Sequence, residues 1–168
     1  MKEMKVTQIL SDEHRTVLEQ LDRLEAALGG ASGEVDIAAV EGVLRFFQTG
    51  LPIHRRKEEE ILFPLLGDRI GHEEGPVACM LHEHEIERGL VDQLCDAVER
   101  AKRGAATGGQ ARAAGHAILD LLRNHIAKED NILFPLAEQV LDEADKARVR
   151  EGFSRIGACC AACAGRKS

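Results

Sequence analysis

Residues 54–65 read HRRKEEEILFPL, and residues 125–136 read HIAKEDNILFPL. Eight of the twelve positions are identical without a gap, where about one match is expected by chance. In both stretches a glutamate follows a histidine by four residues, so His54 and Glu58 project from one face of a helix, as do His125 and Glu129. The chain therefore contains an internal repeat of two similar helices, and this repeat decides the fold.

The repeat extends upstream of these two stretches. His14 lies 40 residues before His54, and His84 lies 41 residues before His125. Each upstream histidine directly follows a glutamate. We therefore predict two helical hairpins, each with Glu-His on its first helix and His-x-x-x-Glu on its second.

Apolar residues recur in steps of three and four through most of the chain, between segments that contain glycine. We predict an all-α domain over residues 1–156, built as an antiparallel up-down-up-down four-helix bundle. Pro52 is expected to bend the second helix, and Pro64 with Gly67 to end it. The expected helices cover about residues 4–28, 36–66, 76–103 and 109–140, followed by a short helix over 142–156 that Asp142 would cap and a loose tail over 157–168.

Four histidines and two glutamates of the repeat fall on the apolar stripes of their helices. They are the candidate metal ligands His14, His54, Glu58, His84, His125 and Glu129. Two buried carboxylates close together are costly unless cations neutralise them, and neutral imidazoles bring no charge. Metal ions would supply it, and helical bundles hold dinuclear carboxylate sites in this manner.

The number of donors indicates the stoichiometry. Six exceed what one tetrahedral zinc ion takes. Two histidines per metal with both glutamates bridging would give each of two ions four protein donors, and a bridging solvent oxygen would leave one position open. This mixture suits non-haem iron, although zinc or manganese could also occupy it. Asp130 is the alternative to Glu129, or else it lies outside the ligand set, whereas Lys57, Glu59 and Glu60 are expected on a solvated face.

These motifs resemble the hemerythrin-like, or HHE cation-binding, family over about residues 5–140. The resemblance rests on Glu13-His14, His54-x-x-x-Glu58 with Phe63-Pro64, Glu83-His84, and His125-x-x-x-Glu129 with Phe134-Pro135. It implies a four-helix bundle with a centre of two iron ions and an oxo or hydroxo bridge. It further implies terminal ligands at His14, His54, His84 and His125, and bridging ligands at Glu58 and Glu129.

The chain departs from the oxygen-carrying hemerythrins, which have a further histidine one turn away on the third helix. Here Met80 and Arg88 stand four residues before and after His84. The set of four histidines and two glutamates looks more like HHE proteins linked to nitric oxide, peroxide or the repair of iron centres. The remaining histidines are expected at the surface or around the ligands: His72, His82 and His116.

The five cysteines do not suggest a disulfide framework, which favours a reducing compartment and a cytoplasmic location. Cys159, Cys160 and Cys163 form a CCxxC cluster that is either a redox or metal-transfer element or a set of incidental thiols. Cys79 and Cys95 are expected to pack within a helix.

Composition excludes several functions. The formal charge of −7 argues against a nucleic-acid partner. No apolar run approaches the roughly 20 residues of a membrane span. The chain has no tyrosine or tryptophan, so it cannot form a tyrosyl or tryptophanyl radical.

Three hypotheses for function follow. The first is an enzyme that reduces or disproportionates nitric oxide, oxygen or peroxide, with electrons from an unidentified donor. The second is a sensor or carrier that binds oxygen, nitric oxide or iron without turnover. The third is an interaction protein that a metal merely stabilises. We expect a monomer or a weak homodimer.

Overall fold

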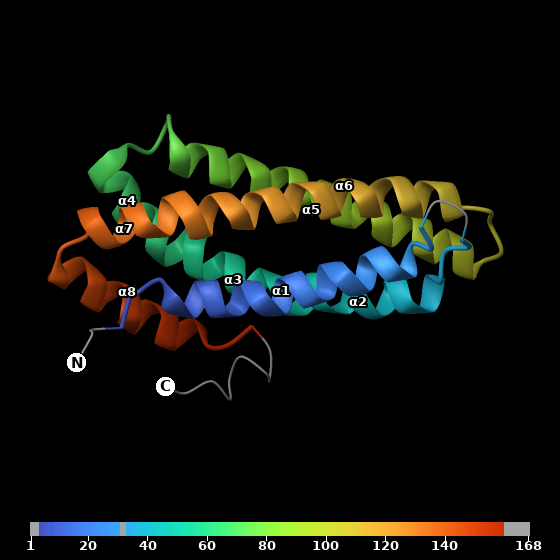
Figure 1. The fold of residues 1–168 in the computed structure, drawn as a ribbon, viewed down its shortest axis with the longest axis horizontal. Coiled ribbons are helices and arrows are strands. Elements are labelled where there is room, and N and C mark those ends of the chain that lie inside the picture. The colour runs from blue at the N-terminus through green and yellow to red at the C-terminus, as the bar shows by residue number, and fades with distance from the viewer. Residues whose placement is uncertain (1–3, 31–32, 160–168) are drawn as a thin grey trace.

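The computed structural model describes residues 4–30 and 33–159, and over these ranges the chain is helical without strands, as predicted. The helices form an elongated bundle (Figure 1). In chain order they are α1 (Gln8–Ala27), α2 (Ile37–Thr49), α3 (Leu51–Arg56), η1 (Lys57–Leu62), α4 (Phe63–Ile70), α5 (Pro76–Lys102), α6 (Gly108–Lys128), η2 (Glu129–Leu133), α7 (Phe134–Val140) and α8 (Glu143–Ile156). Among the described residues, none of these helices has both the length and the apolar character that crossing a bilayer requires.

Consecutive helices join into longer segments. The helices α2, α3, η1 and α4 follow one another almost without interruption, and so do α6, η2 and α7. Together with α1 and α5, these segments lie side by side along the long axis of the molecule (Figure 1). α1 packs against α2 and α6, and α5 packs against the same two helices, so the segments enclose a shared interior.

Two apolar clusters fill this interior, one on each side of the candidate ligands. Along α1, Leu10 belongs to one cluster and Val17 to the other, and His14 lies between them. The other three candidate histidines stand between members of the two clusters along their own helical segments. The candidate ligands thus interrupt the apolar core partway along the bundle, and both clusters shield them from water.

The second helical segment contains Pro52 and Pro64. It follows the prediction near Pro52 but not at Pro64. The second helical segment is interrupted at Gly50, two residues before Pro52, where a bend was expected. It does not end at about residue 66, between Pro64 and Gly67, but continues to Ile70, so the predicted end was too early. Gly71 ends the segment with a φ of 104°, a left-handed conformation that suits glycine.

A π-helical turn explains how the helix passes Pro64. In η1 the N–H of Phe63 donates to the carbonyl of Glu58, five residues earlier. Proline in a regular α-helix would meet the carbonyl four residues before it and leave a hydrogen bond unmade. The wider turn replaces the α-helical hydrogen-bonding pattern just before the proline, and η2 repeats this ahead of Pro135. Such π-turns are rare and often occur at functional sites, and here each contains a candidate glutamate.

The helix expected over 142–156 is present as α8 and is fastened to the bundle. The side chain of Asp142 accepts a hydrogen bond from the backbone of Asp145, as expected of the N-cap residue. Arg69 of α4 reaches both aspartates, with its Nη2 at 2.8 Å from Asp142 and 2.5 Å from Asp145. α8 packs against η1, where Gly152 lies against Ile61.

The cysteines divide between surface and interior. Cys159 is buried, and its backbone N–H lies 3.4 Å from Oε1 of Glu13. Cys160 and Cys163 lie outside the described residues. Cys79 is exposed rather than packed, which corrects the prediction, whereas Cys95 packs partly against the core.

Candidate metal centre

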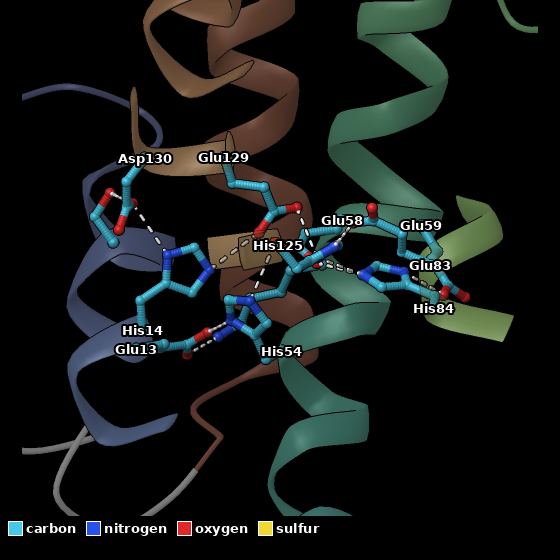
Figure 2. Close-up of polar contacts among 12 residues, drawn as sticks. Glu13, His14, His54, Glu58, Glu59, Glu83, His84, His125, Glu129 and Asp130 are labelled. Carbon is cyan, nitrogen blue, oxygen red and sulfur yellow. Dashed lines mark hydrogen bonds and ion pairs between the residues drawn. The ribbon is translucent and has the colours of Figure 1, made fainter. Parts of the chain in front are cut away.

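All the candidate ligands converge in the middle of the bundle (Figure 2). Each of the helical segments that enclose the interior supplies at least one of them: His14 comes from α1, His54 from α3, Glu58 from η1, His84 from α5, His125 from α6 and Glu129 from η2. All of them are buried, and both glutamates are 0% exposed. The structure therefore brings together every candidate ligand that the sequence indicates.

Each carboxylate oxygen of the two glutamates faces the Nε2 atom of a different histidine. The oxygen-to-nitrogen distances are 3.1 Å from Glu58 Oε1 to His54, 3.3 Å from Glu58 Oε2 to His84, 3.2 Å from Glu129 Oε2 to His14 and 3.2 Å from Glu129 Oε1 to His125. Each glutamate thus joins a histidine of the first half of the repeat to a histidine of the second. This is the placement that a bridging carboxylate needs.

The donors divide into two groups of four that share both glutamates. The groups are His14, His54, Glu58 and Glu129, and His84, His125, Glu58 and Glu129. Within each group the candidate ligand atoms lie within 4.8 Å of one another. Two imidazole nitrogens and two carboxylate oxygens form a donor set that suits a transition metal ion.

The inner carboxylates have few hydrogen bonds of their own. Among the described residues, all four oxygens of Glu58 and Glu129 are buried without a properly directed hydrogen-bond donor, and so is Nε2 of His14. Buried polar atoms normally have partners, because an unsatisfied charged group is costly. Cations held between these atoms would account for the arrangement, so the residues present fit a metal centre.

A ring of outer carboxylates surrounds the histidines (Figure 2). Each lies within hydrogen-bonding distance of an Nδ1 atom: 3.0 Å for His14 and Asp130, 2.9 Å for His54 and Glu13, 2.7 Å for His84 and Glu59, and 2.8 Å for His125 and Glu83. An Nδ1–H that donates outward leaves the Nε2 lone pair directed to the centre. The outer carboxylates therefore select the tautomer that binds metal.

Polar groups hold the outer carboxylates in turn. Lys57 contacts Glu13, Lys128 contacts Glu83, Arg88 contacts Glu59 and Ser11 contacts Asp130. Lys57 is buried and Glu59 contacts His84, so their placement on a solvated face was wrong; Glu60 is exposed as expected. Asp130 does not replace Glu129 but contacts His14 from outside the donor groups.

The repeat contained a signal for the parts of this ring that sequence reasoning missed. Glu13 and Glu83 occupy equivalent positions in the two halves, as do Lys57 and Lys128. The two acidic residues that directly follow the inner glutamates, Glu59 and Asp130, are also equivalent. The similarity between the two halves of the repeat thus extends to the groups around the ligands.

The inner glutamates determine the protonation of the histidines. Burial lowers the pKa of His54, but Glu58 and Glu13 outweigh it and raise that pKa to about 10. Burial likewise lowers the pKa of His84, and Glu58 and Glu59 raise it to about 9. Burial raises the pKa of Glu58, whereas His54 and His84 together hold it well below its usual range. Metal ions would therefore displace protons when they bind.

Two phenylalanines support the histidine rings. Phe134 stacks on His14 with ring centroids 5.4 Å apart, and Phe63 stacks on His84 at 5.9 Å. Both follow the π-turns directly, so the turn that places a glutamate also places an aromatic ring. The remaining histidines, His72, His82 and His116, are exposed.

An all-helical bundle with a buried cluster of histidine and glutamate side chains able to hold metal defines a class of metal-binding bundle proteins. The chain belongs to the hemerythrin HHE cation-binding domain family, whose model matches residues 5–137. The expectation drawn from the motifs is thus confirmed.

Two relatives have names that state a function. The chain is similar to the iron-sulfur cluster repair protein DnrN of Neisseria gonorrhoeae, at 30% identity over 126 residues that cover 72% of this chain and 80% of that protein. It is also similar to the iron-sulfur cluster repair protein YtfE of Salmonella paratyphi B, at 35% identity over 91 residues that cover 52% of this chain and 41% of that protein. The chain therefore spans less than half the length of this second relative. No solved structure gives a significant match.

Proposed function

We propose that this protein holds two iron ions and reduces or disproportionates a small oxidant, namely nitric oxide, oxygen or peroxide, in the defence or repair of iron centres. The observation that carries the proposal is the pair of donor groups that share Glu58 and Glu129. The relatives named as iron-sulfur cluster repair proteins support the stress role. The contacts of α1 and α5 with α2 and α6 support the antiparallel four-helix arrangement as its scaffold.

The residues have distinct tasks in this proposal. Iron bound here would supply electrons and an open position for a small ligand. The inner glutamates would bind the iron ions and neutralise part of their charge, and the histidines would bind them through Nε2. The outer carboxylates hold the Nδ1 protons of the histidines. The two apolar clusters exclude water, which restricts the ligand to a small molecule. Reduction of one peroxide to two waters consumes two electrons and two protons, so repeated turnover needs an external electron donor, which we propose as the partner.

The experiment is the metal content and absorption spectrum of aerobically purified protein, followed by consumption of peroxide or nitric oxide with dithionite as reductant. We expect two irons per chain, near-ultraviolet bands of a bridged ferric pair, and multiple turnovers. Glu58→Ala should lose both iron and turnover, whereas the exposed Glu60→Ala should keep both. Protein that is metal-free or holds a single zinc would overturn the proposal.

A sensor or carrier remains the second candidate, because the cavity beside the centre is small, about 10 Å³ measured to the centre of a water-sized sphere. Such a protein would bind one small ligand per centre reversibly and release it unchanged. Stoichiometric binding without product in the same assay would favour this function over the enzyme.

A further inference from the structure

A small cavity adjoins the candidate metal centre on the side of the apolar cluster that contains Val17. Its size, about 10 Å³ measured to the centre of a water-sized sphere, is about that of a single water molecule, so a larger ligand would need the side chains of the wall to move. Its lining consists of five pairs of residues that occupy equivalent positions in the two halves of the repeat. The pairs are His14 with His84, Val17 with Glu87, Leu51 with Leu122, His54 with His125, and Arg55 with Ile126.

Two of these pairs break the symmetry of the cavity. Where one half has Val17, the other has Glu87, and where one half has Ile126, the other has Arg55. The two polar residues contact each other, with Arg55 Nη1 at 2.9 Å from Glu87 Oε1. Their apolar counterparts show that the fold accepts apolar side chains in these positions. The ion pair is therefore not a requirement of packing.

The ion pair is buried and incompletely satisfied. The side chain of Arg55 is 10% exposed and that of Glu87 is 2% exposed. Arg55 Nε and Glu87 Oε2 have no hydrogen-bond partner among the described residues. The attraction within a buried ion pair rarely offsets the cost of removing both charges from water unless the remaining donors and acceptors also form hydrogen bonds. A hydrogen-bond donor and an acceptor are thus available at the wall of a cavity that all four candidate histidines also line.

We propose that Arg55 and Glu87 form a recognition subsite for a small anion, or for a small ligand that gains negative charge, bound at the metal centre. The Nε–H of Arg55 donates to the ligand, and Glu87 is a positioning residue that holds the guanidinium group through Nη1. This inference rests on the proposed di-iron function and adds to it a preference for ligands that carry or gain negative charge. A planar guanidinium is suited to this task because its donors have fixed directions.

The test uses azide as the probe on the ferric, iron-loaded full chain. Azide affinity is measured from its charge-transfer absorption, and the azide stretching frequency is measured by infrared spectroscopy. The main variant is Arg55→Ile with Glu87→Val, which installs the counterparts already present in the other half of the repeat. Removing both partners leaves no unpaired buried charge, so we expect this variant to fold and retain two irons.

We expect the double variant to bind azide about tenfold more weakly and to shift the stretching frequency, because a charge-assisted hydrogen bond is lost. Glu87→Gln should act in the opposite direction and bind azide a few times more tightly, since the opposing negative charge is removed. Damage to the fold would weaken binding in both variants. The control Arg56→Gln removes an exposed arginine that pairs with Glu60, and it should leave azide binding unchanged.

Variants with native iron content, an unchanged stretching frequency and azide affinities within twofold of the parent would overturn the subsite while the proposed function stands. Weaker binding in Glu87→Gln as well as in the double variant would also overturn it. Failure of the parent chain to take up two irons would overturn the proposed function itself, and the subsite with it.

Discussion

The carboxylate of Glu13 lies 2.9 Å from Nδ1 of His54, while Nε2 on the other edge of the ring lies 3.1 Å from Glu58. The imidazole is thus held between an outer and an inner carboxylate. Lys57 contacts Glu13 from the far side, so the charges alternate from the outside of the site to its centre. This chain of contacts connects metal binding to groups that touch no metal.

Glu13→Gln tests the outer contact. An amide can still accept from Nδ1–H but carries no charge, so the ring is less firmly oriented and a weaker donor at Nε2. We expect iron affinity to fall about 10- to 100-fold, as is typical when an outer partner of a metal-binding histidine is lost. Competition with a chelator measures it. The matched control is Glu19→Gln on the exposed face of α1, and equal effects of the two changes would refute the role of Glu13.

Lys57→Met tests the buried charge pair, and the repeat provides its control. The side chain of Lys57 is 2% exposed, whereas that of its counterpart Lys128 is 37% exposed. Removal of Lys57 leaves a buried carboxylate without its cation, which costs about 3–5 kcal/mol of unfolding free energy. Lys128→Met should cost about 1 kcal/mol or less, because the side chain of Lys128 is itself partly exposed and water screens its charge. Urea denaturation of the two variants measures the difference.

The sequence predicted the helical class and the residues of the centre because both depend on periodicity. His54 and Glu58 are one helical turn apart on an apolar stripe, and the repeat places an equivalent pair on another helix. The structure adds the distances that show both glutamates between the two halves. These distances depend on how the helices pack, which no single helix specifies.

Lys57 shows why the surroundings of the site were harder to predict. A lysine is almost always solvated, and its burial requires a partner such as Glu13, 44 residues away in the sequence. The π-turns were missed for a related reason. Pro64 was interpreted as a helix end, because a regular α-helix cannot accommodate proline in its interior, and a turn of different width was not anticipated.

Gly152→Ala tests how closely α8 fits the π-turn. A methyl group at this position would lie 2.7 Å from side-chain carbons of Ile61 in η1, so the Ile61 side chain or one of the two helices must shift. We expect a loss of about 1–3 kcal/mol in unfolding free energy, typical of overpacking. Gly89→Ala in α5 is the control, because nothing lies within 4 Å of the added methyl group. That change should instead stabilise the helix by about 0.5–1 kcal/mol, and a gain in both variants would contradict the close fit.

Metal-free protein should lose stability as the pH rises, in contrast to the loaded form. Against the opposing effect of burial, Glu58 and Glu13 raise the pKa of His54 to about 10, and Glu58 and Glu59 raise that of His84 to about 9. A raised histidine pKa contributes stability that is complete below the unfolded value of about 6.5 and is lost as the pH rises through the folded value. Protein freed of metal by a chelator should therefore melt at least about 5 °C lower at pH 10 than at pH 6.5.

The loaded protein should instead release metal as the pH falls through the imidazole range, because protons compete for Nε2. The control His82→Gln changes an exposed histidine and should follow the parent in both pH series. A melting temperature of the metal-free parent that does not change between pH 6.5 and pH 10 would show that the inner glutamates do not hold protonated histidines.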